Sequence, residues 1–184
     1  MPELTTRFFV ALMLPPEVED YANRVIAELG DRYRTRTAKA APHITLQAPF
    51  RWPHEPDALN TLSTELKAIA AQQPPVPIIL DGFSAFQPRV LYINVAKTPE
   101  LLSLQSALAA HLQPLNIIDP KAKSRSFSPH VTVASRNLSP GLFRRIWADL
   151  RERPAHFEFT CDRLTLLIYR DRWHRHSEYI LASG

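Results

Sequence analysis

The feature that most constrains the fold of this chain is a tetrapeptide that occurs twice, about half a chain length apart. The two copies are Pro42-His43-Ile44-Thr45 and Pro129-His130-Val131-Thr132. Each copy begins a short apolar run. Because residues i and i+2 of a β-strand point to the same face, each histidine is expected to share a face with the threonine that follows it. Two such strands can bring two imidazoles and two hydroxyls to one cleft.

A single His-x-Thr on a strand carries little information, because a half-exposed strand commonly turns polar residues outward. Two copies in matching contexts are a poor fit to coincidence. We therefore interpret His43, Thr45, His130 and Thr132 as one functional set rather than as surface residues of two unrelated strands.

The elements around the tetrads also repeat. Hydrophobic patterning predicts the order strand, helix, His-x-Thr strand, helix, strand over residues 6–86 and again over 89–170, followed by a C-terminal strand over 177–183. Within these halves, 76–86 is expected as a strand with a turn at Asp81-Gly82, and 157–169 as one long strand or a bent pair. Gln87-Pro88-Arg89 is a turn and not a flexible linker. We therefore expect one domain over 1–184, made of two pseudo-symmetric lobes that share a cleft.

Composition limits the class of protein. Cys161 is the only cysteine, so no internal disulfide can form, and no apolar run is long enough to span a membrane. We expect a cytoplasmic monomer without membrane contact. The net charge of +4 favours an anionic ligand, but it is too small to indicate tight binding to bulk nucleic acid.

The paired residue types suit the hydrolysis of a phosphodiester. One histidine can take a proton from water and the other can protonate the departing oxygen, because the imidazole pKa is near 6.5. Threonine hydroxyls can stabilise the charge that builds on the phosphoryl oxygens. Zinc binding would need a third ligand, and neither tetrad provides one at metal spacing. There is no G-x-S-x-G or P-loop motif. No cofactor and no metal are expected.

These residues resemble the 2H phosphoesterase superfamily, and within it the RNA 2′,3′-cyclic phosphodiesterases, also called 2′–5′ RNA ligases. The resemblance covers nearly the whole chain and is carried by RFFVAL, PHITL, DGFSAFQPRVLYINV and FSPHVTVA. It implies an α+β, bilobal, pseudo-two-fold duplicated fold, with two antiparallel sheets flanking a central cleft and helices on the outside. It also implies metal-independent hydrolysis of an RNA 2′,3′-cyclic phosphate end to a 2′-phosphate. The implied partner is an RNA, an oligonucleotide or a small cyclic nucleotide.

The resemblance assigns catalysis to His43 and His130, and phosphate binding to Thr45 and Thr132. It favours His130 as the base and His43 as the acid, although the pseudo-symmetry of the sequence leaves this choice open. The family commonly has arginine five positions after the second histidine. Here Ser135 occupies that position and Arg136 follows it. Adjacent strand residues face opposite sides, so Arg136 reaches the site only if a bulge shifts it.

Further candidates lie near the tetrads. Basic residues precede both, and Arg125 is placed to meet the substrate. Phe50 and Phe127 could stack a base, although core packing is the alternative for each. His174-x-His176 could bind a metal, but a basic rim or an exposed hairpin turn is the simpler interpretation.

Three functions remain open on the sequence alone. The first is hydrolysis of the cyclic phosphate. The second is 2′–5′ ligation or 2′–5′ bond cleavage at the same site, since ligation is the microscopic reverse. The third is a non-catalytic module that binds RNA ends.

Overall fold

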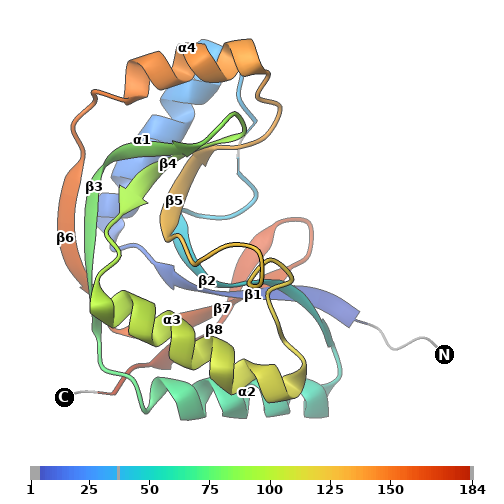
Figure 1. The fold of residues 1–184 in the computed structure, drawn as a ribbon. Coiled ribbons are helices and arrows are strands. Elements are labelled where there is room, and N and C mark those ends of the chain that lie inside the picture. Colours follow the sequence, from blue (N-terminus) through green and yellow to red (C-terminus); the bar gives the residue numbers. More distant parts are fainter. Residues whose placement is uncertain (1–4, 37, 183–184) are drawn as a thin grey trace.

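The computed structural model describes residues 5–36 and 38–182. Within these residues, four α-helices and a short 3₁₀ turn alternate with eight strands (Figure 1). In chain order the elements are β1 (Thr5–Met13), α1 (Pro16–Tyr33), β2 (His43–Pro53), α2 (Pro56–Ala70), β3 (Val76–Phe86), β4 (Val90–Val95), α3 (Pro99–Leu112), η1 (Gln113–Leu115), β5 (His130–Ala134), α4 (Pro140–Leu150), β6 (His156–Cys161), β7 (Arg163–Tyr169) and β8 (Trp173–Ile180).

The predicted repeat of element order is confirmed. The first copy is β1-α1-β2-α2-β3 and the second is β4-α3-β5-α4 followed by β6 and β7. Each of the four α-helices has a proline in its first turn, where the missing N–H costs nothing. Thr98 and Ser139 cap α3 and α4 by accepting hydrogen bonds from the backbone N–H three residues later, at 3.3 and 3.2 Å.

The strands form two four-stranded sheets, in the orders β2-β1-β7-β8 and β5-β4-β3-β6, and all six pairings are antiparallel. Figure 1 shows α2 and α3 together beside the first sheet, and α1 and α4 together beside the second. The expected α+β architecture, with two antiparallel sheets and outer helices, is confirmed.

The two sheets do not coincide with the expected lobes at 6–86 and 89–170. The third strand of the first copy, β3, lies beside β4 in the second sheet, and β7 of the second copy lies beside β1 in the first sheet. The segment expected as one long strand or a bent pair divides at Asp162 into β6 and β7, which belong to different sheets. The two copies therefore exchange strands. Hydrophobic periodicity reveals which side of a strand is apolar, but not which strand lies beside it.

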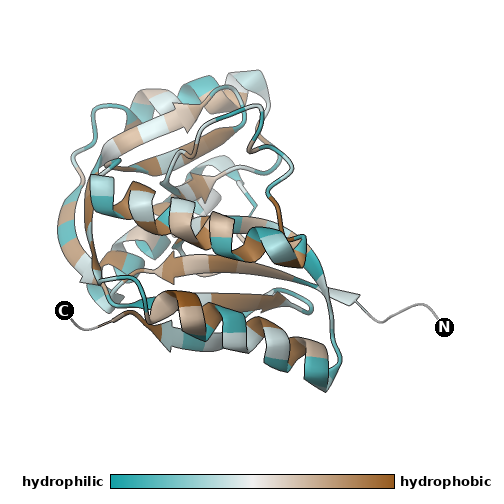
Figure 2. Cartoon of the chain, turned by 60° about the horizontal axis from the view of Figure 1, so that its bottom comes forward, coloured by the Kyte–Doolittle hydropathy of each residue, from teal (hydrophilic) through white to brown (hydrophobic). Residues whose placement is uncertain are grey.

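The larger of two hydrophobic clusters among the described residues runs through both sheets. It includes the fully buried side chains of Phe8 and Leu12 in β1, Ile93 in β4 and Leu164 in β7, together with residues of all four α-helices. Burying a side chain of this size contributes about 1.5–3 kcal/mol. Figure 2 shows hydrophobic and hydrophilic positions alternating around the helices, as expected for helices that pack one face against a core.

Two local predictions need correction. Asp81-Gly82 is a bulge within β3 and not a turn, because Leu80 pairs with Val95 whereas Phe83 pairs with Ile93, and Gly82 has φ of 67°. The last strand runs over Trp173–Ile180 and not from residue 177, so His174 and His176 lie within β8 and not in a hairpin turn.

No helix within residues 5–36 and 38–182 is both long enough and apolar enough to cross a membrane. The same residues hold no group of three or more His, Cys, Asp or Glu side chains arranged to hold a metal.

Candidate active site

The two tetrads begin the edge strands of the two sheets. His43 opens β2 and His130 opens β5. These two edges lie against each other, and the start of β5 lies beside β2 in Figure 1. The imidazoles are close enough that the charge of His130 contributes to lowering the pKa of His43. The contact between β2 and β5 thus brings together two motifs that are distant in the sequence.

The side chains alternate along both strands as expected. Ile44 and Val131 are fully buried in the core, whereas both histidines and both threonines are partly exposed. We call the opposite side of each sheet, which carries the histidines, the histidine face. In register, the pairs on this face are Met13–His43, Ala11–Thr45, Asn94–His130 and Tyr92–Thr132.

Both imidazoles are held in the same way. Nδ1 of His43 lies 2.7 Å from the carbonyl oxygen of Ala41, and Nδ1 of His130 lies 2.8 Å from that of Ser128. A carbonyl can only accept, so Nδ1 carries the hydrogen and Nε2 of the neutral ring keeps its lone pair. The accepting residue stands directly before each tetrad, and the proline that follows restricts it to an extended backbone. The proline in the motif therefore helps to orient the ring.

Burial is the main cause of the pKa shifts at both rings. It lowers the pKa of His43 and of His130 below the ordinary value, because the charged imidazolium loses hydration. The carbonyl bonds act in the opposite direction on both. Arg125 also lowers the pKa of His130 by charge repulsion, which places this predicted residue within electrostatic reach of the second histidine.

Aromatic rings flank each imidazole. The ring of Phe9 lies 4.8 Å from that of His43. Phe86 and Tyr92 lie 5.0 and 5.1 Å from His130. Ala11, fully buried between Phe9 and Met13 on the same face of β1, leaves room for the rings of Phe9 and His43 to meet. The sequence reasoning missed these aromatic residues. The signal available in the sequence is that these rings occupy alternate positions of predicted strands. That signal identifies the face of each ring only when the neighbouring strand is known.

Each tetrad is followed by a one-residue bulge at the same position. Ala11 pairs with Thr45 and Val10 with Gln47, so Leu46 is extra in β2. Tyr92 pairs with Thr132 and Leu91 with Ala134, so Val133 is extra in β5. A bulge re-aims the residues that follow it and is common beside active sites. The match between the two bulges supports the duplication independently of the sequence motif.

The bulge at Val133 changes which residue after Thr132 is the next to lie on the histidine face. Ala134 is turned to the core with Leu91, so alternation returns Ser135, and not Arg136, to the face of His130 and Thr132. Both residues are exposed and lie beyond the end of β5. On continued alternation Arg136 is not expected on the face of His130, and its contact with a substrate stays a prediction.

The two phenylalanines proposed to stack a base are partly buried and pack against the core. Phe50 pairs with Phe8, whose side chain points away from the histidine face, and their rings lie 6.2 Å apart. Phe127 is also partly buried against the same core. Both positions thus contribute to core packing, and base stacking by either ring stays a prediction.

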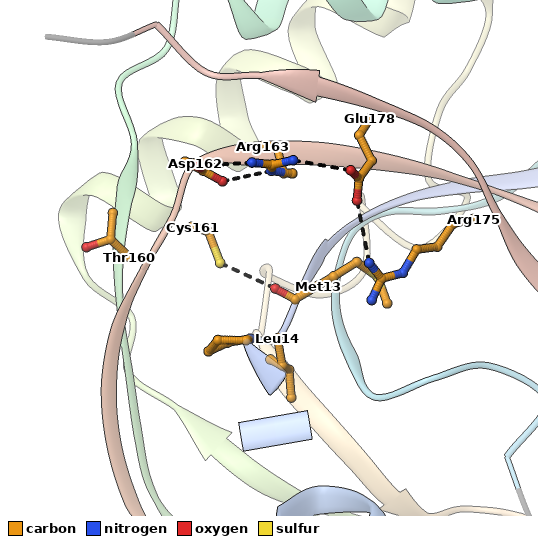
Figure 3. Close-up of a pocket in the computed structure, with 9 residues that line it drawn as sticks. Met13, Leu14, Thr160, Cys161, Asp162, Arg163, Arg175 and Glu178 are labelled. Atoms are coloured by element: carbon orange, nitrogen blue, oxygen red, sulfur yellow. Dashed lines mark hydrogen bonds and ion pairs between the residues drawn. The ribbon is translucent and has the colours of Figure 1, made fainter. Parts of the chain in front are cut away.

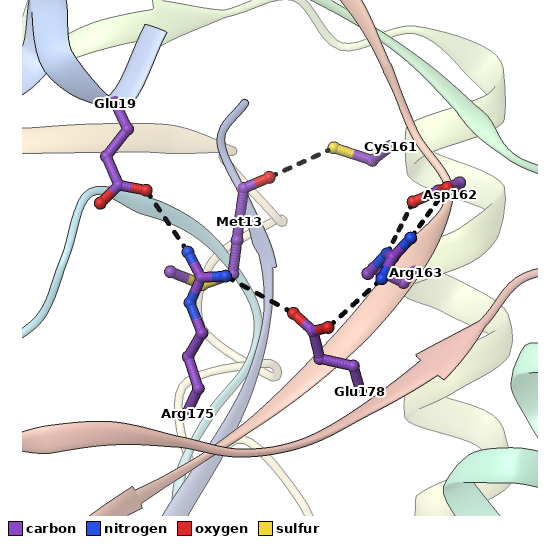
Figure 4. Close-up of polar contacts among 7 residues, drawn as sticks. All are labelled: Met13, Glu19, Cys161, Asp162, Arg163, Arg175 and Glu178. Carbon is purple, nitrogen blue, oxygen red and sulfur yellow. Dashed lines mark hydrogen bonds and ion pairs between the residues drawn. The ribbon is translucent and has the colours of Figure 1, made fainter. Parts of the chain in front are cut away.

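A pocket of about 260 Å³ lies beside Met13, the cross-strand partner of His43, and beside the junction of β6 and β7 (Figure 3). Two arginines in it are neutralised by carboxylates (Figure 4). Arg163 pairs with Asp162 and Glu178, and Arg175 pairs with Glu178 and Glu19. Burial raises the pKa of the Cys161 thiol to about 12, as expected for a packing residue.

The chain is similar to known proteins along most of its length. The model of the 2′-5′ RNA ligase superfamily matches residues 14–173. A protein of Bacillus cytotoxicus named "Putative phosphoesterase" is 33% identical over 171 residues, which cover 91% of this chain and 92% of that protein. A protein of Geobacillus kaustophilus with the same description is 30% identical over 166 residues, covering 88% and 87%.

Solved structures share the fold. TT0787 of Thermus thermophilus superposes with a TM-score of 0.69 at 19% identity, covering 97% of this chain and 99% of that one. E. coli LigT complexed with 3′-AMP gives a TM-score of 0.66 at 20% identity, with the same coverage.

Proposed function

Because the chain belongs to the 2′-5′ RNA ligase superfamily of 2H phosphoesterases, we propose that it hydrolyses 2′,3′-cyclic phosphate ends of RNA to 2′-phosphates. The observation that carries the proposal is the matched pair of histidines. Each has its Nδ1 bonded to a backbone carbonyl, and each keeps Nε2 for proton transfer. A general acid and a general base in this form are the machinery that a cyclic phosphate requires.

The proposed reaction is an in-line attack of water on phosphorus. Nε2 of neutral His130 takes a proton from the water as its oxygen bonds to phosphorus. The bond from phosphorus to the 3′-oxygen breaks, and Nε2 of protonated His43 gives its proton to that oxygen. The phosphate then remains on the 2′-oxygen. The hydroxyls of Thr45 and Thr132, on the same strand faces as the histidines, donate to the phosphoryl oxygens as their charge increases.

Relatives support a nucleotide ligand. The solved structures of E. coli LigT include complexes with 3′-AMP, with ATP and with NADP+. These ligands all carry phosphate on a nucleoside. A terminal ribonucleotide on an RNA has the same chemical components.

The test is turnover of a short RNA that ends in a 2′,3′-cyclic phosphate, in the presence of a chelator. We expect conversion to a 2′-phosphate end, and no effect of the chelator, because the two histidines supply both proton-transfer steps. The mass of one added water reports hydrolysis, and a phosphatase specific for 3′-phosphates distinguishes the 2′- from the 3′-phosphate product, because the two are isomers of equal mass.

The same assay separates the alternatives. Adding an RNA with a free 5′-hydroxyl reports ligation through the appearance of a longer product, and a 2′–5′-linked dinucleotide reports bond cleavage. A module that only binds RNA ends would show affinity for the cyclic end without any product, and this result would contradict the proposal.

A further inference from the structure

Two cations lie on a pair of aromatic rings at the opposite end of the first sheet from the neutralised pocket. The guanidinium carbon of Arg7 lies 4.0 Å above the ring of Tyr169 and 5.7 Å from that of Trp173. The Lys39 ammonium donates to the Tyr169 hydroxyl at 3.0 Å. We call these four residues the Arg7–Lys39 cluster. They come from β1, β7, β8 and the loop before β2, so the sheet and not the sequence assembles them.

The cluster continues the surface that holds His43. Arg7, Phe9 and Ala11 alternate onto the histidine face of β1. The ring of Phe9 contacts both His43, at 4.8 Å, and Trp173, at 4.6 Å. Trp173 then lies 5.2 Å from Tyr169. A row of touching rings therefore joins the proposed acid to the two cations. The backbone N–H of Trp173 also donates to the carbonyl of Lys39 at 2.8 Å, which fixes the loop at the end of this row.

The cations in the cluster differ from other cations on this face in having no carboxylate partner. Within the described part of the chain, Arg7 and Lys39 form no ion pair, whereas Arg163 and Arg175 each have two. The nearby carboxylate of Asp171 accepts from His174 at 2.9 Å. Lys39 lowers the pKa of Tyr169, first through the hydrogen bond and then through its charge. Aromatic faces hold such cations without neutralising them, so the positive charge remains available to an anion.

The charge on the histidine face of the first sheet differs between its two ends, and this difference would orient a bound polyanion. At the Met13 end, three carboxylates surround the two arginines of the pocket (Figure 4). At the Arg7 end, the carboxylate of Asp171 is bonded to His174, whereas Arg7 and Lys39 have no ion-pair partner among the described residues. An RNA strand whose terminal phosphate lies between the histidines is repelled at one end of the sheet and attracted at the other.

We propose that Arg7 and Lys39 bind the phosphodiester that precedes the terminal nucleotide of the RNA, and that Tyr169 and Trp173 position them. This inference rests on the proposed function and extends it from the reacting phosphate to substrate selection. It implies that the protein prefers oligonucleotide ends over mononucleoside cyclic phosphates. Arg7 and Lys39 act as binding residues, and Tyr169 is a positioning residue that acts through both.

The test compares two substrates with the same reacting end. One is a mononucleoside 2′,3′-cyclic phosphate, and the other is a dinucleotide that ends in the same cyclic nucleotide. For the unaltered protein, kcat/KM should be higher for the dinucleotide. Arg7→Gln and Lys39→Gln should each reduce it by about tenfold for the dinucleotide, the usual effect of losing a charge-assisted hydrogen bond. Both should leave the mononucleotide unchanged. The unchanged activity also shows that the variants are folded.

A neutral substrate linkage provides the matched control. A dinucleotide whose internal phosphodiester is replaced by an uncharged methylphosphonate should lose the preference with the unaltered protein, and Arg7→Gln should have no further effect on it. Arg144→Gln removes the same charge from α4, on the outside of the second sheet, and should leave all three substrates unchanged. Tyr169→Phe keeps the ring under Arg7 but removes the Lys39 bond, so its effect should match that of Lys39→Gln alone.

Failure of this inference differs from failure of the proposed function. If the protein hydrolyses mononucleotide and dinucleotide equally, or if Arg7→Gln slows both alike, the subsite is wrong and the hydrolase remains. If neither substrate is hydrolysed, the proposed function is wrong. Binding of an oligonucleotide with a 2′-phosphate end, measured by titration calorimetry, then decides the subsite alone. Weaker binding of this oligonucleotide by Arg7→Gln than by the unaltered protein supports the subsite. Equal binding by the two proteins overturns it.

Discussion

The residue-scale design of the site is a matched orientation of two imidazoles. The bonds from Nδ1 to the carbonyls of Ala41 and Ser128 select the same tautomer on both rings. A ring held in this way needs no reorientation before it transfers a proton. The two rings therefore differ only in their surroundings: Phe9 packs on His43, whereas Phe86, Tyr92 and the charge of Arg125 surround His130.

Removing either imidazole should be costly. We expect His43→Ala and His130→Ala each to lower kcat for the cyclic phosphate by a factor on the order of 10²–10⁴, the usual contribution of a general acid or base. The double variant should cost little more than either single one, because the two act as a unit. Thr45→Ala and Thr132→Ala should cost less, since one neutral donor is lost. Steady-state rates for the five variants check this, and full activity of His130→Ala would contradict it.

A leaving group that needs no proton separates the two roles. With an activated aryl phosphodiester, His43→Ala should regain most of its activity, because the departing phenolate requires no acid. His130→Ala should remain slow, since the water still requires a base. Rates of phenolate release measure both. If instead His130→Ala regains activity and His43→Ala does not, His130 is the acid and His43 is the base. If neither variant regains activity, both histidines act in binding and not in proton transfer.

The pH dependence should reflect the burial of both rings. Activity of the free enzyme requires one neutral and one charged imidazole, so kcat/KM should be bell-shaped. Burial lowers both pKa values. The alkaline limb, where the acid loses its proton, should therefore lie below about pH 6.5. The limb in kcat should lie at higher pH, because a bound phosphate stabilises the imidazolium. Profiles from about pH 4.5 to 8 test this, and an alkaline limb of kcat/KM above about pH 7 would contradict it.

At the scale of elements, the bulge after each tetrad determines which later residues of the strand can lie on the histidine face. Leu46 and Val133 are the extra residues, and each resets the alternation of its strand. A strand without the bulge would turn the residue at position 134 onto the histidine face. With the bulge, alternation returns position 135 to that face.

This bulge makes two substitutions informative. Arg136→Ala should change kcat/KM by less than about twofold, within the small effects usual for an exposed residue that touches no substrate. Ser135→Arg should lower KM, because it places a cation beside Thr132 on the phosphate side. It should also move the pH limb of His130 further to acid by charge repulsion. Kinetics of the two single variants decide between the positions. A loss of more than about tenfold in Arg136→Ala would assign the phosphate contact to Arg136.

The sequence predicts the elements better than their partners. Both His-x-Thr strands, the four α-helices and their proline-led starts follow from local signals that the structure preserves, such as the Thr98 and Ser139 caps. The exchange of β3 and β7 between sheets does not, because no local pattern encodes which strand lies beside which. The same limit explains Phe50, which lies close to the motif in sequence but on the opposite face. It also explains Arg7 and Tyr169, which meet only because β1 and β7 are neighbours.

At the scale of the whole molecule, the strand exchange couples the two lobes. Neither sheet can form from one half of the sequence, since β1 and β2 need β7 and β8, and β4 and β5 need β3. The core is likewise continuous across both sheets. One ion pair, Arg175–Glu19, also joins β8 of the first sheet to α1, which packs against β5 of the second.

Coupling of this kind predicts a single unfolding transition. Trp52 lies in β2 of the first sheet and Trp147 in α4 beside the second, so each tryptophan reports on a different lobe. One variant keeps only Trp52 and another keeps only Trp147. In each variant, the urea midpoint measured by fluorescence should equal the midpoint measured by circular dichroism on the same variant.

Fragments 1–87 and 88–184, prepared separately, should each lack the dispersed NMR spectrum of a folded domain, because each would expose the apolar strand faces that the other covers. Two separate midpoints, or a folded fragment, would show that the lobes are independent units and that the exchanged strands contribute little to their stability.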